Sequence, residues 1–163
     1  MKKLSLKQDR LLFAVVLILY ILSVLVITIG ARSYDNETAI NLIPLNSYKK
    51  MFAPVIDGLI ANGMRGALDR LKWVDYASRS SVVLNIFLFV PFGYLCPLCI
   101  KKLDMWHKIL LVGIGFSVFI EFTQLITHRG WFDVDDIIHN GLGTFIGWLC
   151  YRRWLRPLYK QEQ

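Results

Sequence analysis

The sequence predicts an all-α integral membrane protein: a bundle of four transmembrane helices with an amphipathic interfacial helix in the first external loop. Its 163 residues are 55% hydrophobic, and the mean hydropathy of +0.46 is high for an ordinary soluble domain. Several apolar stretches approach the length of about 20 residues that a helix needs to cross about 30 Å of hydrocarbon. The chain has the length of one compact bundle, so we expect residues 1–163 to form a single membrane domain.

The first expected span, residues 11–29, carries no charged side chain and follows a basic segment. It resembles a signal peptide, but its apolar part is longer than the roughly 7 to 15 residues of a cleaved signal, so we interpret it as an uncleaved anchor. The other spans are expected over residues 81–100, 109–126 and 137–151. In the last of them, Gly143 and Gly147 are spaced to allow another helix to approach closely.

The loop between the first two spans contains a second amphipathic pattern. Apolar residues recur at helical spacing from Phe52 to Ile60, and charged residues flank them. We therefore expect residues 50–71 to form an interfacial helix that lies on the membrane. A soluble helix packed against the bundle is the alternative.

Lysine and arginine predict the orientation of the bundle. Four of these residues precede the first span, three separate the second from the third, and four follow the last, whereas the short loop 127–136 holds only Arg129. The positive-inside rule therefore places both termini in the cytoplasm. Because the basic residues flank apolar runs, the net charge of +7 is interpreted as topology and not as nucleic-acid binding.

In this topology, a set of polar residues lies at one depth near the outer surface. Asp133, Asp136 and Asn140 follow three- and four-residue spacings and share one helix face, whereas Asp135 is expected to point elsewhere. Ionisable side chains at such positions are costly unless they are paired, face protein or water, or perform chemistry. The candidate site consists of Asn85, Glu121, Gln124, Arg129, Asp133, Asp136 and Asn140.

Several kinds of chemistry fit this set. Glu121 could pair with Arg129, while the amides hydrogen-bond between helices and only hold the bundle together. The excess of carboxylates would also suit a divalent cation such as Mg²⁺ or Ca²⁺. Alternatively, Glu121 could act as a buried acid or base while Arg129 holds a phosphate or carboxylate. No sequence motif of a known catalytic class accompanies these residues, so whether a reaction is catalysed stays open.

The same residues carry a family resemblance. The chain resembles the VanZ family in four segments: Asn41-Leu42-Ile43-Pro44; Asn85 with Phe87, Phe89, Pro91, Phe92 and Gly93; Glu121 with Gln124; and Arg129, Asp133, Asp136, Asn140, Gly143 and Gly147. Two departures are that Leu45 stands where the family often has Phe, and that three residues, not two, separate Arg129 from Asp133. The resemblance implies a bacterial plasma-membrane protein that contributes to glycopeptide resistance of the teicoplanin type.

We expect these residues to form an outer-leaflet polar pocket that binds or modifies an envelope lipid or lipid-linked headgroup. In this hypothesis Arg129 holds the anion, Glu121 is the acid or base, and Asp133 and Asp136 bind a cation or orient Arg129. The amides of Asn85, Gln124 and Asn140 set the geometry. The alternative is a non-catalytic membrane scaffold or small transporter in which the polar cluster is structural.

Overall fold

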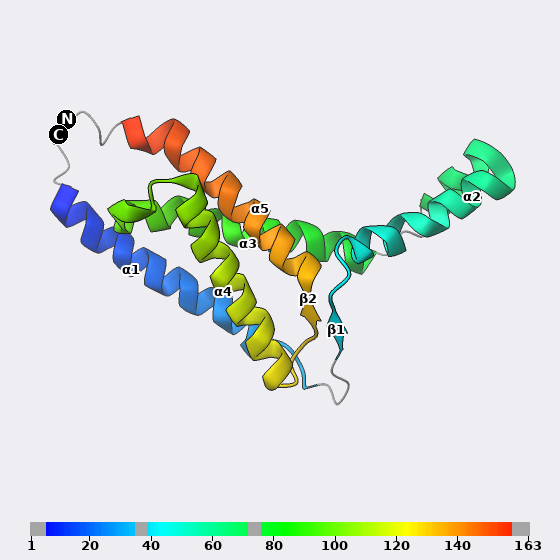
Figure 1. Ribbon diagram of the computed structural model, residues 1–163, viewed down its shortest axis with the longest axis horizontal. Coiled ribbons are helices and arrows are strands. Elements are labelled where there is room, and N and C mark those ends of the chain that lie inside the picture. Colours follow the sequence, from blue (N-terminus) through cyan, green and yellow to red (C-terminus); the bar gives the residue numbers. More distant parts are fainter. Residues whose placement is uncertain (1–5, 35–38, 72–75, 158–163) are drawn as a thin grey trace.

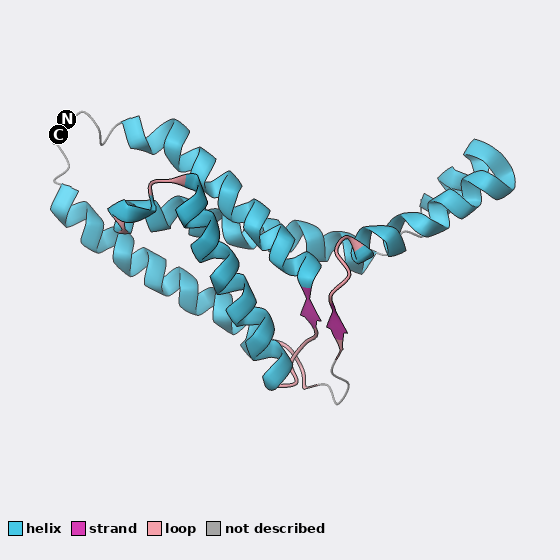
Figure 2. Ribbon diagram, in the orientation of Figure 1, coloured by secondary structure: helices cyan, strands magenta, loops and turns pink. Residues whose placement is uncertain are grey.

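The computed structural model describes residues 6–34, 39–71 and 76–157, and nearly all of them are helical (Figure 2). These residues contain five α-helices: α1 (Leu6–Leu25), α2 (Asn46–Leu71), α3 (Tyr76–Cys99), α4 (Trp106–Ile126) and α5 (Val134–Cys150). Two of them continue into π-helical turns, α1 into Val26–Gly30 and α5 into Tyr151–Leu155.

Three helices in the described residues are long and apolar enough to cross a membrane: Asp9–Gly30, Val82–Cys99 and Trp106–Ile126. They coincide with the first three expected spans. Large apolar side chains on α1, among them Leu11, Leu12 and Ile18, are exposed on the protein surface, as lipid-facing side chains are in a membrane protein. The described part of the chain is therefore a helical membrane protein.

The core lies where α3 and α5 pack together. A Cβ atom on Gly143 would lie 2.2 Å from the backbone oxygen of Ile86, and one on Gly147 would lie 2.0 Å from that of Val90. The two helices therefore meet backbone to backbone, which confirms the close approach expected from these glycines. Phe89, Phe92, Ile109, Ile120 and Trp148 fill the buried core beside this contact.

The start of α1, the turn between α3 and α4, and the end of the last helix lie at one end of the molecule (Figure 1). There the Arg156 guanidinium lies 2.6 Å from the Asp104 carboxylate, and the indole N–H of Trp148 donates to the Asp104 carbonyl at 2.9 Å. The turn that follows α4 lies at the opposite end. Of the basic residues that predict the orientation, Lys2, Lys3 and Lys160 lie outside the described residues.

A short parallel strand pair joins the loop after α1 to the start of α5, which an all-α prediction does not include. Strand β1 (Ile40–Asn41) pairs with β2 (Phe132–Asp133), with Asn41 opposite Asp133 in register. Two-residue strands carry no alternating apolar pattern that sequence could reveal. The pairing brings the beginning of α2 next to the beginning of α5 (Figure 1).

Helix α2 projects away from the bundle (Figure 1). It starts at Asn46, earlier than the expected interfacial helix, and is broken where Asn62 and Gly63 leave helical geometry. After this break the chain folds back, so that a Cβ atom on Gly58 would lie 2.5 Å from the Gly66 backbone oxygen. The predicted apolar face is present, because Phe52, Ile56, Leu59 and Ile60 are all exposed.

Candidate functional site

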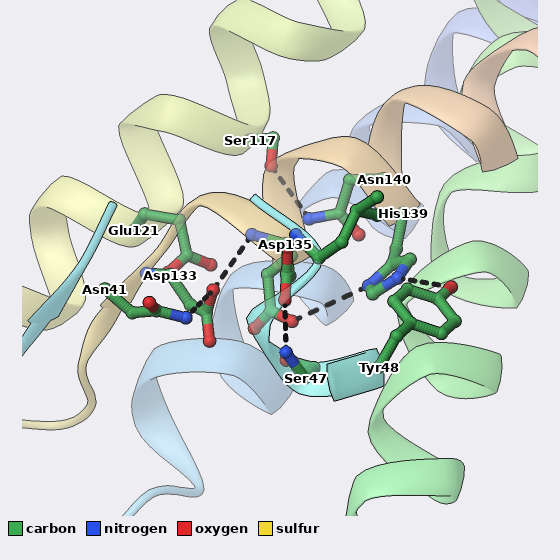
Figure 3. A network of polar contacts seen from close by, with 11 residues as sticks. Asn41, Ser47, Tyr48, Ser117, Glu121, Asp133, Asp135, His139 and Asn140 are labelled. Carbon is green, nitrogen blue, oxygen red and sulfur yellow. Dashed lines mark hydrogen bonds and ion pairs between the residues drawn. The ribbon is translucent and has the colours of Figure 1, made fainter. Parts of the chain in front are cut away.

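The cluster of polar side chains is built around the start of α5. Asp133 is the N-cap of this helix, and its Oδ1 atom accepts a hydrogen bond from the backbone N–H of Asp135 at 2.9 Å. The same oxygen accepts from Asn41 Nδ2 at 3.0 Å across the strand pair (Figure 3). Asp133 therefore satisfies a free N–H of its own helix and ties β1 to β2.

Asp135 points away from the other carboxylates, as helical spacing predicts. It is buried, and its two oxygens accept hydrogen bonds from the backbone N–H groups of Leu45 and Ser47, the latter at 2.8 Å (Figure 3). Burial by itself would raise the pKa of Asp135, but the hydrogen bonds from Ser47 and Leu45 outweigh it and lower the pKa. Asp135 is thus an anionic cap for the first turn of α2.

Glu121 reaches this region from α4. Its Oε2 atom accepts a hydrogen bond of 3.0 Å from the backbone N–H of Asp133, and the side chain is only 2% exposed. Asp136 and Asp133 lie close enough for their charges to act on Glu121. A buried carboxylate with carboxylate neighbours is electrostatically costly, so this arrangement favours a proton or a cation beside Glu121.

Asp136 lies at the start of α5, and 18% of its side-chain surface is exposed. Burial, together with the Asp133 charge, raises its pKa from 3.8 to about 6, while Arg32 and the nearby Asn85 side chain act to lower it. His139 lies one turn further along, with Nδ1 4.0 Å from Asp136 Oδ1. The other ring nitrogen of His139 shares a 2.9 Å hydrogen bond with the Tyr48 hydroxyl of α2 (Figure 3).

Two of the three amides in the predicted set, Gln124 and Asn140, are buried between helices. Asn140 Nδ2 donates to Ser117 Oγ on α4 at 2.8 Å (Figure 3). Gln124 Nε2 donates to the backbone oxygen of Thr28, at the end of the first span, at 2.8 Å. Each amide uses one hydrogen-bonding atom to hold neighbouring helices together, and its other polar atom has no partner among the described residues.

From the sequence, Arg129 could pair with Glu121 or hold an anion, whereas in the structure its guanidinium donates to backbone oxygens. Its Nη1 atom donates to the backbone oxygens of Gly30 at 3.1 Å and Arg32 at 3.2 Å, and lies 3.5 Å from that of Ile29. These are free carbonyls at the C-terminal end of the first span, where a positive charge is favourable. No ion pair joins Arg129 to Glu121 within the described residues.

The structure brings six of the seven predicted residues into one cluster. They are Glu121, Asp133, Asp136, Asn85, Gln124 and Asn140. It also adds residues that sequence reasoning missed: Arg32, Asn41, Tyr48, Ser117 and His139. Asn41 belongs to one of the four segments that carry the family resemblance. No pattern in the sequence points to Arg32 as a site residue, because only the fold places its charge beside Glu121 and Asp136.

Within the described residues, no group of three or more His, Cys, Asp or Glu side chains is placed to hold a metal ion. Asp133, one of the expected cation ligands, has its Oδ1 atom engaged by Asn41 and by the Asp135 N–H.

Comparison with known proteins supports the resemblance noted in the sequence. The VanZ/LLP1 family matches residues 11–156, which is most of the chain and includes every residue of the cluster. No curated protein and no solved structure shows a significant match. With apolar helices of membrane-spanning length and a match of this extent, the chain belongs to the VanZ/LLP1 family, a family of envelope membrane proteins associated with glycopeptide resistance.

Proposed function

We propose that this polar cluster faces the outside of a bacterial plasma membrane and binds an envelope lipid or lipid-linked headgroup. By holding that component, the protein changes how glycopeptides of the teicoplanin type reach their target. The family membership supports the link to resistance. The cluster supports binding, because its polar side chains come from the second half of α4 and from the start of α5, away from the start of α1 and the end of the last helix (Figure 1).

The proposed topology has four spans and two cytoplasmic termini. The fourth span is supported by α5, whose 17 residues continue into the five residues of the turn Tyr151–Leu155. At about 1.5 Å per residue, this continuous helix is long enough to cross about 30 Å of hydrocarbon. In the same topology, the exposed apolar side chains of α2 would rest on the outer membrane surface as an interfacial helix.

One observation carries the binding proposal: three buried polar atoms of the cluster lack a hydrogen-bond partner among the described residues. They are Gln124 Oε1, His139 Nδ1 and Asn140 Oδ1. Gln124, His139 and Asn140 are 1%, 2% and 4% exposed. Leaving such an atom unpaired costs about 1–3 kcal/mol, and folded proteins contain few of them. A bound polar headgroup would supply the missing partners.

A membrane scaffold is the second candidate, because part of the set has a structural role. Asp133 and Asp135 cap helices, and Arg129 binds the free carbonyls at the end of the first span. These residues would be needed for folding under either function. The two functions therefore differ at the residues of the cluster that cap no helix end.

Variants that separate binding from folding test the proposal. In Asn85→Leu, the amide beside Asp136 is replaced by an apolar group of similar size, which alters no helix cap and should leave thermal stability close to that of the wild type. Teicoplanin resistance of cells that express this variant should be lost if the amide serves a ligand. Asp135→Asn is the matched comparison, because it should lose resistance together with stability.

The measurements are the minimum inhibitory concentration of teicoplanin, the amount of protein in the membrane and the Tm of the purified protein. Retention of envelope lipids by the purified protein, measured by native mass spectrometry, should fall in Asn85→Leu. If resistance follows Tm across all variants and Asn85→Leu stays resistant, the scaffold function is correct and the binding proposal is wrong.

A further inference from the structure

Among the described residues, Arg32 is a cation whose charge acts on the cluster. It follows the end of the first span, and its side chain is exposed. A Cβ atom on Gly130 would lie 2.7 Å from Arg32 Nη1 and 3.2 Å from Gln124 Oε1, so the guanidinium lies against Gly130 beside Gln124. Its charge acts on both Glu121 and Asp136. Arg129, by contrast, donates to backbone carbonyls at the end of the first span.

The guanidinium is accessible to a ligand. Among the described residues, no hydrogen bond or ion pair uses its nitrogen atoms. Guanidinium groups bind phosphate through parallel N–H donors, and an exposed one beside a buried polar cluster can bind an anion at the protein surface.

The interior of the cluster has the opposite character. Glu121 and Asp136 are carboxylates, and the unpaired Gln124 Oε1 and Asn140 Oδ1 atoms are also acceptors. Both amide side chains are more than nine-tenths buried. Acceptors that are buried and unpaired require hydrogen-bond donors, and two nearby carboxylates require positive charge.

We propose, on the basis of the proposed binding function, that the cluster takes a phosphate-linked primary amine, with the phosphate on Arg32 and the ammonium among Glu121, Asp136 and Gln124. A primary ammonium fits because it has three donors, a positive charge and no acceptor. A quaternary ammonium lacks the donors, and a headgroup with hydroxyls alone lacks the charge. The ligand chemistry is thus that of a phosphoethanolamine group, either on a lipid or free in solution.

The test uses the full-length purified protein in detergent with four probes. They are short-chain phosphatidylethanolamine, phosphatidylcholine, phosphatidylglycerol and the soluble headgroup glycerophosphoethanolamine. Dissociation constants are measured by titration. Phosphatidylethanolamine should bind at least about tenfold more tightly than phosphatidylcholine or phosphatidylglycerol, since each lacks a charged hydrogen bond that the ethanolamine makes. Equal or tighter binding by glycerophosphoethanolamine supports a soluble ligand, and weaker binding supports a lipid. Either result supports the amine chemistry.

Two variants test the place of the phosphate. Arg32→Gln should weaken binding of phosphatidylethanolamine about tenfold. Arg32→Lys keeps the charge but lacks the parallel N–H donors of the guanidinium, so it should also weaken binding. It changes only the end of an exposed side chain, so Arg32→Lys remains informative if Arg32→Gln is poorly folded. The matched control, Arg153→Gln, changes an exposed arginine in the turn Tyr151–Leu155 and should bind as the wild type does.

The outcomes distinguish this inference from the proposed function. If all three lipids bind equally, or if Arg32→Gln and Arg32→Lys bind as the wild type does, the amine inference is wrong while lipid binding stands. If none of the four probes binds and the protein retains no envelope lipid, the proposed function is wrong as well.

Discussion

The Asp135 carboxylate accepts a 2.8 Å hydrogen bond from the backbone N–H of Ser47, a residue 88 positions earlier in the chain. A second bond, from the N–H of Leu45, ends on the other carboxylate oxygen. Helix α2 begins at Asn46 and cannot satisfy these first N–H groups itself. The start of α5 therefore provides the cap that positions α2.

Removal of this cap should loosen α2. Asp135→Ala leaves two backbone donors without their acceptor, so we expect the free energy of unfolding to fall by about 2 kcal/mol. Hydrogen exchange of residues 46–50 should become faster. Asp57→Asn removes an exposed carboxylate from the same helix and serves as the control. Unchanged exchange in Asp135→Ala would show that α2 forms without this cap.

Arg129 should matter for stability. Its guanidinium binds carbonyls at the end of the first span, so Arg129→Ala should destabilise the protein by about 1–2 kcal/mol. Exchange of the amides in residues 26–32 should increase in the same variant. Arg153→Gln, which changes an exposed arginine at the other end of the bundle, should leave both measurements unchanged. A stable Arg129→Ala protein that has lost ligand binding would instead assign Arg129 to the ligand.

The contact between α3 and α5 should tolerate no side chain at Gly143. In Gly143→Ala, the Cβ atom meets the rigid backbone of Ile86 at 2.2 Å, so the helices must separate at a cost of about 1–3 kcal/mol. Gly115 on α4 is the matched control, since a Cβ atom there has no neighbour within 4 Å. Gly115→Ala should be neutral or raise stability by about 0.5–1 kcal/mol through helix propensity. Thermal unfolding of both variants decides the comparison.

The stability of the protein should depend on pH through Asp136. The pKa of this carboxyl is about 6 in the folded protein, above its ordinary 3.8. Between these values the folded state binds more protons than the unfolded state, so stability is full below about pH 4 and is lost as the pH rises through 6. The difference in Tm between Asp136→Asn and wild type should therefore grow in favour of the variant from pH 4.5 to 7. A constant difference would contradict the raised pKa.

Local features of the sequence were enough to predict most of the helices. Apolar length marks three helices of the described residues that are long enough to cross a membrane, and the glycine spacing in residues 137–151 marks a close helix contact, because both depend on residues near one another in the chain. The polar residues could be placed at one end of the bundle for the same reason. The strand pair Asn41–Asp133 could not be predicted, because two residues on each side are too few to show a period.

The sequence by itself determined a helical membrane protein of the VanZ type and a set of polar residues gathered near one end. Only the tertiary structure decided which of them remain available to a ligand. Arg129 meets Gly30 across 99 positions, and Asp135 meets Ser47 across 88. Composition carries no information about which hydrogen-bond partners such distant segments bring together. Once packing assigns Arg129, Asp133 and Asp135 to backbone groups, the unpaired amides, Glu121, Asp136 and Arg32 are left to form the candidate site.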